Sequence, residues 1–153
     1  MLFRSRGSVT SIAWVPHGGW VASCSYWDGT VKVWSAPGLG GCSATIKVSQ
    51  VWSLAVSPDS RLLAAGCFDG KVHLLTPDGT VKEVLEGHTD SVKCVCFDGP
   101  GDLLASASQD RTARVWTLDH VPVEQVVRHP QCECVVGRFL TLRDATAVSS
   151  RVS

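Results

Sequence analysis

His88, Ser106 and Asp110 are residues of this 153-residue chain whose types could carry out covalent chemistry. In a hydrolase, an aspartate orients a histidine, and the histidine takes the proton of a serine nucleophile. Such enzymes also need a turn that exposes the serine, such as Gly-x-Ser-x-Gly, and donors for an oxyanion. Ser106 stands in Leu-Ala-Ser-Ala-Ser, which has neither feature. We therefore disfavour the hydrolase interpretation and predict no catalytic residue.

Cysteine is the second residue type that could carry chemistry, as a nucleophile or a metal ligand. Seven cysteines occur, at positions 24, 42, 67, 94, 96, 132 and 134. Cys94-x-Cys96 and Cys132-x-Cys134 each place two thiols on one face of a strand, but zinc sites usually use a gap of two to four residues with a matching histidine cluster. Most of the cysteines lie in apolar runs and no secretory signal precedes them. We predict reduced thiols packed as small hydrophobic residues, with no metal site.

Charge and composition exclude several other functions. Lysine plus arginine equals aspartate plus glutamate at 14 each, so the formal net charge is zero. Nucleic acids and anionic membranes both favour a basic excess, so neither is an expected partner. The glycine-rich stretch 38–41 opens no helix and predicts a turn instead of a phosphate-binding loop, and no cofactor is expected. Without a signal peptide or a run of 18 apolar residues, we expect a cytoplasmic protein, with the nucleus as the alternative.

The elements that would position these residues repeat along the chain. A residue pair with a spacing of six recurs every 41 residues: Asp28 with Trp34, Asp69 with Leu75, and Asp110 with Trp116. A period in the low forties is typical of proteins in which each repeat is one small sheet. Asp-Gly at 28–29 and 69–70 predicts hairpin turns, whereas Arg111 replaces the glycine in the third unit and leaves the geometry of that turn open.

Each unit contains short apolar runs separated by Pro, Gly and Asp clusters, which predict strands and turns. The runs are apolar on both faces, as in sheets that stack face to face. With fourth strands expected near 43–48, 80–85 and 123–128, the predicted fold class is all-β. We expect a partial β-propeller of about three four-stranded antiparallel blades, arranged as an open arc and not as a closed ring.

On these residues the chain resembles the WD-repeat β-propeller family. The third unit carries the fullest signature, with Gly87-His88, the run from Leu104 to Asp110, and Val115-Trp116. The resemblance implies a structural hydrogen-bond network that joins a hairpin turn to the inner strands through four side chains: His88, Ser106, Asp110 and Trp116. It also implies that the recurring aspartates are hairpin-turn residues: Asp28, Asp69 and Asp110. The chain departs from the family pattern at Leu75, which replaces a tryptophan, and in the two earlier units, which lack the Gly-His pair.

The resemblance also places the residue before each turn aspartate toward one face of the propeller. These residues are Trp27, Phe68 and Gln109. Aromatic side chains dominate interaction hot spots, so we predict a partner-binding face there. The alternative is that these residues pack against a neighbouring blade.

We expect four segments: blade 1 with a degenerate start (1–49), blade 2 (50–86), blade 3 (87–130), and an aborted fourth repeat with a disordered tail (131–153). Three blades cannot close a ring, so we expect a fragment or splice product with open blade faces that favour self-association.

The predicted function is a non-catalytic scaffold that mediates protein–protein interactions within a multiprotein complex. The alternative is the substrate-recognition or regulatory portion of a ubiquitin ligase or a nucleotide-driven assembly. WD-repeat receptors of cullin-type ligases often carry an acidic residue after the blade tryptophan and an arginine three positions further on. Thr117 and His120 stand at these positions, so the sequence does not support that role.

Overall fold

The protein consists of three sheets of four antiparallel strands in the computed structural model, which describes residues 7–15, 19–35, 41–118 and the backbone of 125–128. The first sheet contains β1 (Val9–Trp14), β2 (Trp20–Ser25), β3 (Thr30–Ser35) and β4 (Cys42–Lys47). The second contains β5 (Val51–Val56), β6 (Leu63–Cys67), β7 (Val72–Leu75) and β8 (Val81–Leu85). The third contains β9 (Val92–Phe97), β10 (Leu103–Ser108), β11 (Thr112–Thr117) and β12 (Gln125–Arg128).

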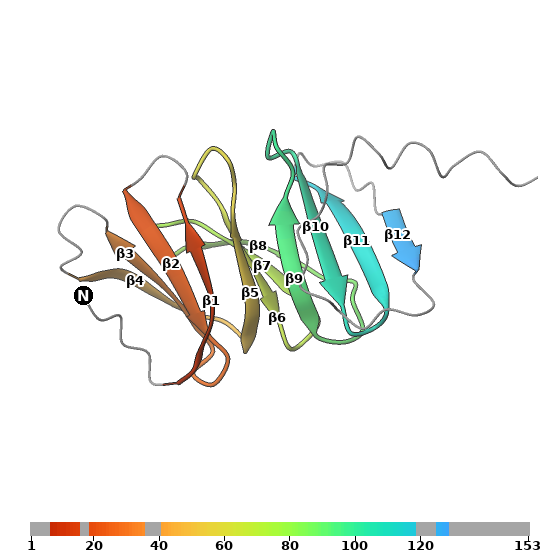
Figure 1. Ribbon diagram of the computed structural model, residues 1–153, viewed down its shortest axis with the longest axis horizontal. Coiled ribbons are helices and arrows are strands. Elements are labelled where there is room, and N and C mark those ends of the chain that lie inside the picture. Colours follow the sequence, from red (N-terminus) through yellow and green to blue (C-terminus); the bar gives the residue numbers. More distant parts are fainter. Residues whose placement is uncertain (1–6, 16–18, 36–40, 119–124, 129–153) are drawn as a thin grey trace, which may run out of the picture.

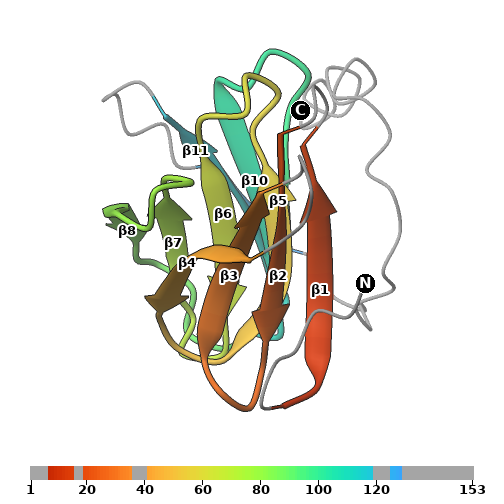
Figure 2. The ribbon, with the colours of Figure 1, turned by 90° about the vertical axis from the view of Figure 1, so that its left-hand side faces the viewer.

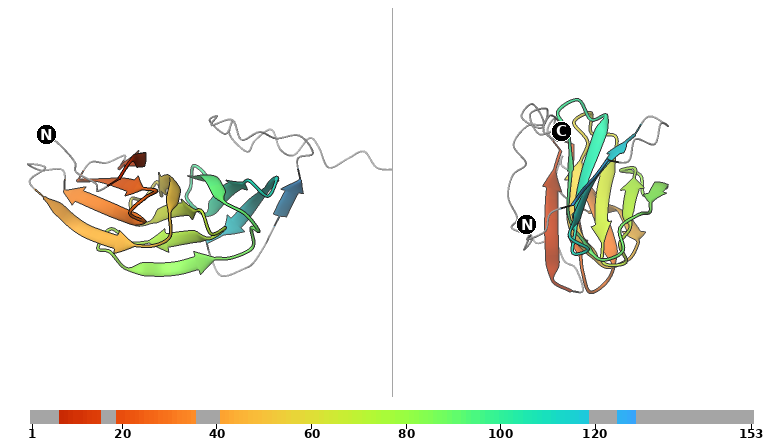
Figure 3. Two further views of the ribbon diagram at one scale, coloured as in Figure 1. Left: turned by 90° about the horizontal axis from the view of Figure 1, so that it is seen from below. Right: turned by 90° about the vertical axis from the view of Figure 1, so that its right-hand side faces the viewer.

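Within each sheet the strands follow one another in chain order, so each strand pairs with the strands next to it in the sequence (Figure 1). Seen from the side of the first sheet, the three sheets lie one behind another (Figure 2). Together they form an open arc of propeller blades (Figure 3). The predicted fold class is therefore confirmed, although the exact blade boundaries stay a prediction and residues 131–153 lie outside the described part. No helix capable of crossing a membrane is found among the described residues.

The apolar core lies between the sheets, which explains why the strands are apolar on both faces. Every residue of β6 is buried. Its consecutive residues Leu63 and Ala64 belong to two different clusters of buried apolar side chains. Leu63 packs between the first and second sheets with Val33. Ala64 packs between the second and third sheets with Leu104. Because side chains alternate along a strand, β6 serves both interfaces at once.

Hydrogen bonds between neighbouring sheets recur with the repeat. The Leu54 backbone N–H donates to Ser11 Oγ at 3.2 Å, and the Val95 backbone N–H donates to Ser53 Oγ at 3.3 Å. Ser11 and Ser53 occupy equivalent positions in β1 and β5, so both blade interfaces contain the same bond. It fixes the height of one inner strand against the next.

The three hairpin turns share one geometry. Gly29, Gly70 and Arg111 have φ values of 62°, 81° and 68°, all in the left-handed region that favours glycine. In each turn the preceding aspartate accepts a hydrogen bond from the backbone N–H two residues further on. The sequence alone did not predict the geometry of the turn at Arg111. In the structure, this turn has the same conformation as the two glycine turns.

Candidate functional site

The third sheet brings four side chains into one continuous hydrogen-bonded chain. The Trp116 indole N–H donates to Ser106 Oγ at 2.8 Å. Ser106 Oγ lies 2.8 Å from His88 Nε2, and His88 Nδ1 lies 2.8 Å from Asp110 Oδ2. The hydrogen-bonded network therefore joins β11 to β10, and β10 to the segment before β9 and to the β10–β11 turn. The four residues come from positions 88, 106, 110 and 116, and the strand register unites them.

The pKa values of two members fix the direction of these bonds. Burial would raise the pKa of the Asp110 carboxyl, but hydrogen bonds from Thr112, His88 and Thr89 outweigh burial and hold it well below its usual range. Burial lowers the pKa of His88, against the opposing effect of Asp110. An ionised Asp110 only accepts, so Nδ1 of a neutral His88 carries the proton and Nε2 accepts from the Ser106 hydroxyl.

This polarity is the one that a serine nucleophile would need, but the setting differs from that of a hydrolase. Ser106 is 0% exposed, and the side chain of His88 is also fully buried. The Ser106 hydroxyl oxygen already accepts a hydrogen bond from the Trp116 indole N–H. No substrate carbonyl can reach this oxygen without displacing the core. The arrangement suits a role in holding the blade together.

The first sheet contains a shorter version of the network that the sequence analysis missed. The Trp34 indole N–H donates to Ser23 Oγ at 3.0 Å, just as Trp116 does to Ser106. One extra residue in the β2–β3 turn places Ser23 eleven residues before Trp34, whereas Ser106 lies ten before Trp116. Strand pairing reveals the equivalence, because Trp34 faces Val21 as Trp116 faces Leu104.

The predicted binding residues Trp27, Phe68 and Gln109 are all exposed. Trp27 is 74% and Phe68 47% exposed, so solvent and not a neighbouring blade covers most of the Trp27 side chain. Tyr26 lies between the two aromatic residues, with ring centroids 5.3 Å from Trp27 and 5.9 Å from Phe68. Within the described residues, no ring or side-chain contact joins Gln109 to this group.

Tyr26 and Trp52 extend the aromatic group, and the sequence analysis singled out neither. Their ring centroids lie 4.7 Å apart, and Lys93 Nζ lies 3.6 Å from the centroid of the Trp52 ring. Tyr26, Trp27, Trp52 and Phe68 form what we call the turn-face aromatic cluster. It spans the first and second sheets, and Lys93 from the third sheet adds a cation. The one insertion in the repeat alignment lies in the first turn and includes Tyr26. It is the feature of the sequence that could have indicated an additional aromatic residue at this face.

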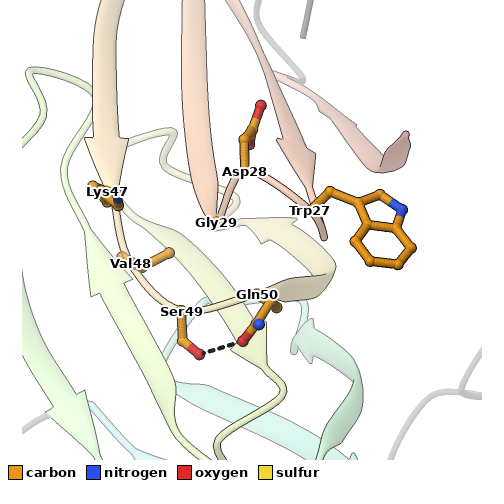
Figure 4. Close-up of a pocket in the computed structure, with 7 residues that line it drawn as sticks. All are labelled: Trp27, Asp28, Gly29, Lys47, Val48, Ser49 and Gln50. Atoms are coloured by element: carbon orange, nitrogen blue, oxygen red, sulfur yellow. Dashed lines mark hydrogen bonds between the residues drawn. The ribbon is translucent and has the colours of Figure 1, made fainter. Parts of the chain in front are cut away.

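A shallow hollow of about 270 Å³ lies beside this cluster, at the connection between β4 and β5. Its lining residues are Trp27, Asp28, Gly29, Lys47, Val48, Ser49 and Gln50 (Figure 4). The Trp27 indole points away from the connection, and Ser49 Oγ donates to Gln50 Oε1 at 3.3 Å (Figure 4). The hollow is open and lacks convergent buried polar groups, so it is an extension of the surface and not a small-molecule pocket.

The cysteines of the described residues are free thiols: Cys24, Cys42, Cys67, Cys94 and Cys96. Burial, followed by the charge of Asp69, raises the pKa of Cys67 to about 12. A thiol of that pKa is protonated near neutral pH and is a poor nucleophile. Cys132, Cys134 and His120 lie outside the described residues.

Comparison with known proteins agrees with the geometry. The family described as "WD domain, G-beta repeat" matches residues 2–35, 40–74 and 78–117. The "Target of rapamycin complex subunit wat1" of Schizosaccharomyces pombe is 33% identical over 138 residues, covering 78% of this chain and 42% of the relative. The "Probable cytosolic iron-sulfur protein assembly protein CIAO1 homolog" of Caenorhabditis elegans is 36% identical over 126 residues, covering 72% of this chain and 37% of the relative.

Solved structures resemble the arc as well. The WD40 repeats of RRP9 superpose with a TM-score of 0.78 at 22% identity, covering 85% of this chain and 41% of that one. U3-55K gives a TM-score of 0.77 at 22% identity, over 84% of this chain and 41% of that one. At this identity the likeness concerns the fold alone. The chain spans less than half the length of the relatives and structures it matches.

Proposed function

Because this chain belongs to the WD40 repeat family, we propose that it is a non-catalytic scaffold that binds other proteins within a multiprotein complex. The relative from Schizosaccharomyces pombe is itself named as a subunit of a complex, which supports this class of role. We place the protein in the cytoplasm, with the nucleus as the alternative. The name of the relative from Caenorhabditis elegans refers to cytosolic iron-sulfur protein assembly, in keeping with that placement.

The observation that carries the proposal is the turn-face aromatic cluster. Trp27 and Phe68 expose much of their apolar surface, yet Tyr26 holds both rings by edge contacts. Held aromatic rings lose little conformational entropy when a partner covers them, which is why they serve as interaction hot spots. Lys93 over Trp52 adds a positive charge at the edge of the cluster. The surface therefore suits a protein partner that offers apolar side chains.

The experiment is proximity labelling in cells with the Trp27→Ala/Phe68→Ala variant. We expect the labelled partners to be lost, while the circular dichroism spectrum is retained because both side chains are exposed. Val81→Ala/Val84→Ala is the matched control, since both side chains are exposed apolar groups on β8 and lie outside the cluster. If the double variant labels the same partners as the unchanged chain, this face does not carry the function.

A further inference from the structure

The β6–β7 hairpin places three potential metal ligands together. Ala65 faces His73 across the hairpin, so Cys67, two residues beyond Ala65, lies on the same face as His73. Asp69 lies in the turn that joins the two strands. The Cys67 thiol, an Asp69 carboxylate oxygen and a His73 ring nitrogen all lie within 4.8 Å of one another. The register of the hairpin thus brings Cys67 and His73 together with Asp69, which lies two residues after Cys67 and four residues before His73.

His73 supplies a second, independent observation. Both ring nitrogens are buried, and neither has a hydrogen-bond partner among the described residues. A buried polar atom without a partner is unfavourable, so its presence in a fold needs an explanation. His88 in the third sheet offers the contrast, because both of its ring nitrogens are satisfied by Asp110 and Ser106. A bound ion would provide His73 with the partner that it lacks.

We propose that Cys67, Asp69 and His73 bind a divalent transition metal of the zinc class, with water as the fourth ligand. Thiolate, imidazole and carboxylate are the donors that zinc takes in proteins, and a site with three protein ligands is a standard arrangement. The Cys67 thiol is protonated in the free chain, and binding of the ion would release its proton to solvent. Zinc–ligand bonds of about 2.0–2.3 Å put tetrahedral donors about 3.3–3.8 Å apart. Donor atoms within 4.8 Å reach that spacing by movements of about 1 Å.

The surroundings favour a cation despite a nearby lysine. Lys71 stands in the same turn, but its ammonium group lies 2.6 Å from the Glu86 carboxylate, which neutralises it. The Lys71 backbone N–H donates to Asp69 Oδ1 at 3.2 Å and so orients the carboxylate. Cys67 is fully buried whereas Asp69 is exposed, so the site opens to solvent on the Asp69 side. An ion therefore has a path of entry.

The equivalent hairpin of the third sheet does not carry these ligands. Arg114 faces Ser106 there, as His73 faces Ala65 in the second sheet. Ser108 stands at the position of Cys67 and donates to the Asp90 carbonyl at 2.8 Å. The ligand set belongs to the second sheet and is not a requirement of the fold. The sequence analysis weighed only the two Cys-x-Cys pairs as metal ligands and did not consider these three residues together.

The test is titration of the whole chain with Co²⁺, followed by competition with Zn²⁺. We expect one equivalent of Co²⁺ to produce thiolate-to-metal charge-transfer absorption and the visible bands of a tetrahedral site. Cys67→Ser abolishes the charge-transfer absorption, while His73→Gln and Asp69→Asn each weaken Zn²⁺ binding at least tenfold. Cys42→Ser and Cys94→Ser are matched controls, which remove thiols outside the set and leave binding unchanged.

Folding is controlled by the choice of variants. Serine already occupies the equivalent buried position at 108, and asparagine is accepted in turns, so Cys67→Ser and Asp69→Asn are mild changes. Zn²⁺ should raise the melting temperature of the unchanged chain but not that of His73→Gln. If His73→Gln binds Zn²⁺ as tightly as the unchanged chain, or if a control abolishes the signal, the chain binds an adventitious metal only and the proposal fails. The Trp27→Ala/Phe68→Ala variant should bind metal normally, which separates this result from that of the scaffold proposal.

Discussion

Asp110 Oδ2 lies 2.8 Å from His88 Nδ1 and joins the β10–β11 turn to the segment that enters β9. The turn is thereby held by a residue more than twenty positions earlier in the chain. Ser106 Oγ extends the network to β11, because it accepts a hydrogen bond from the Trp116 indole N–H. Because Ser106 and His88 are buried and each member satisfies its neighbour, loss of the central hydroxyl affects both sides.

Ser106→Ala should lower the free energy of unfolding by about 1–3 kcal/mol, because it leaves the part-buried Trp116 N–H and the buried His88 Nε2 without partners. Urea unfolding followed by tryptophan fluorescence measures the change. The same variant tests the hydrolase interpretation, since ester hydrolysis by the chain, if any is seen, should be unaffected. Hydrolysis that disappears with Ser106 would contradict the structural role.

Ser23→Ala is the matched comparison in the first sheet. Ser23 Oγ accepts the Trp34 indole, and no histidine ring joins it among the described residues. We therefore expect a smaller loss than for Ser106→Ala. Equal losses from the two variants would show that His88 adds nothing to the network.

The stability of the chain should fall in acid because of the same network. The lowered pKa of Asp110 contributes stability that is present above its unfolded value of about 4 and is lost as the pH falls toward the folded value. Burial also lowers the pKa values of His88 and His73, so their contribution is complete above about pH 6.5 and is lost as the pH falls below it. Urea unfolding at pH 7, 5 and 3 should show decreasing stability at each step.

Asp110→Asn isolates the carboxylate in this profile. The variant should be less stable than the unchanged chain at pH 7, because asparagine cannot accept the same set of charge-assisted bonds. The difference should shrink as the pH falls below about 4, because the unfolded form of the unchanged chain then takes up a proton at Asp110 while the folded form keeps the carboxylate. A difference that stays constant from pH 7 to pH 3 would mean that Asp110 ionisation does not stabilise the fold.

The fold was predictable from sequence because the repeat, the turn aspartates and the apolar runs all indicate the same blade. The residues Asp110 and Trp116 also mark where a network would lie. The equivalence of Ser23 and Ser106 was hidden, because an insertion changes the spacing to tryptophan and only strand pairing restores it. Contacts between neighbouring sheets, such as the ring of Tyr26 against Trp52, depend on blade stacking, which no local pattern encodes.

Gly70→Ala should destabilise the chain by about 2 kcal/mol or more. The residue has a φ of 81°, a conformation that costs an L-residue about 1–2 kcal/mol. A Cβ there would also lie 2.7 Å from the His88 carbonyl oxygen, which is backbone and cannot rotate away. Gly99→Ala is the control, because nothing lies within 4 Å of a Cβ at that position, and its effect should stay within about 0.5 kcal/mol. Thermal melts of the two variants side by side decide the matter; equal melting temperatures would contradict the predicted clash.

The isolated chain should self-associate through the apolar surface of β1. Val9, Ile12 and Trp14 are 50%, 59% and 65% exposed, and they stand on one strand at the end of the first sheet. An exposed apolar edge strand is a template for pairing with a second copy. We expect the mass from light scattering to rise with concentration, and Ile12→Ser/Trp14→Ser to reduce the rise. Trp27→Ser, which removes an exposed indole from another face, should leave it unchanged. A mass that is independent of concentration, or one that the double variant does not lower, would remove β1 as the contact surface.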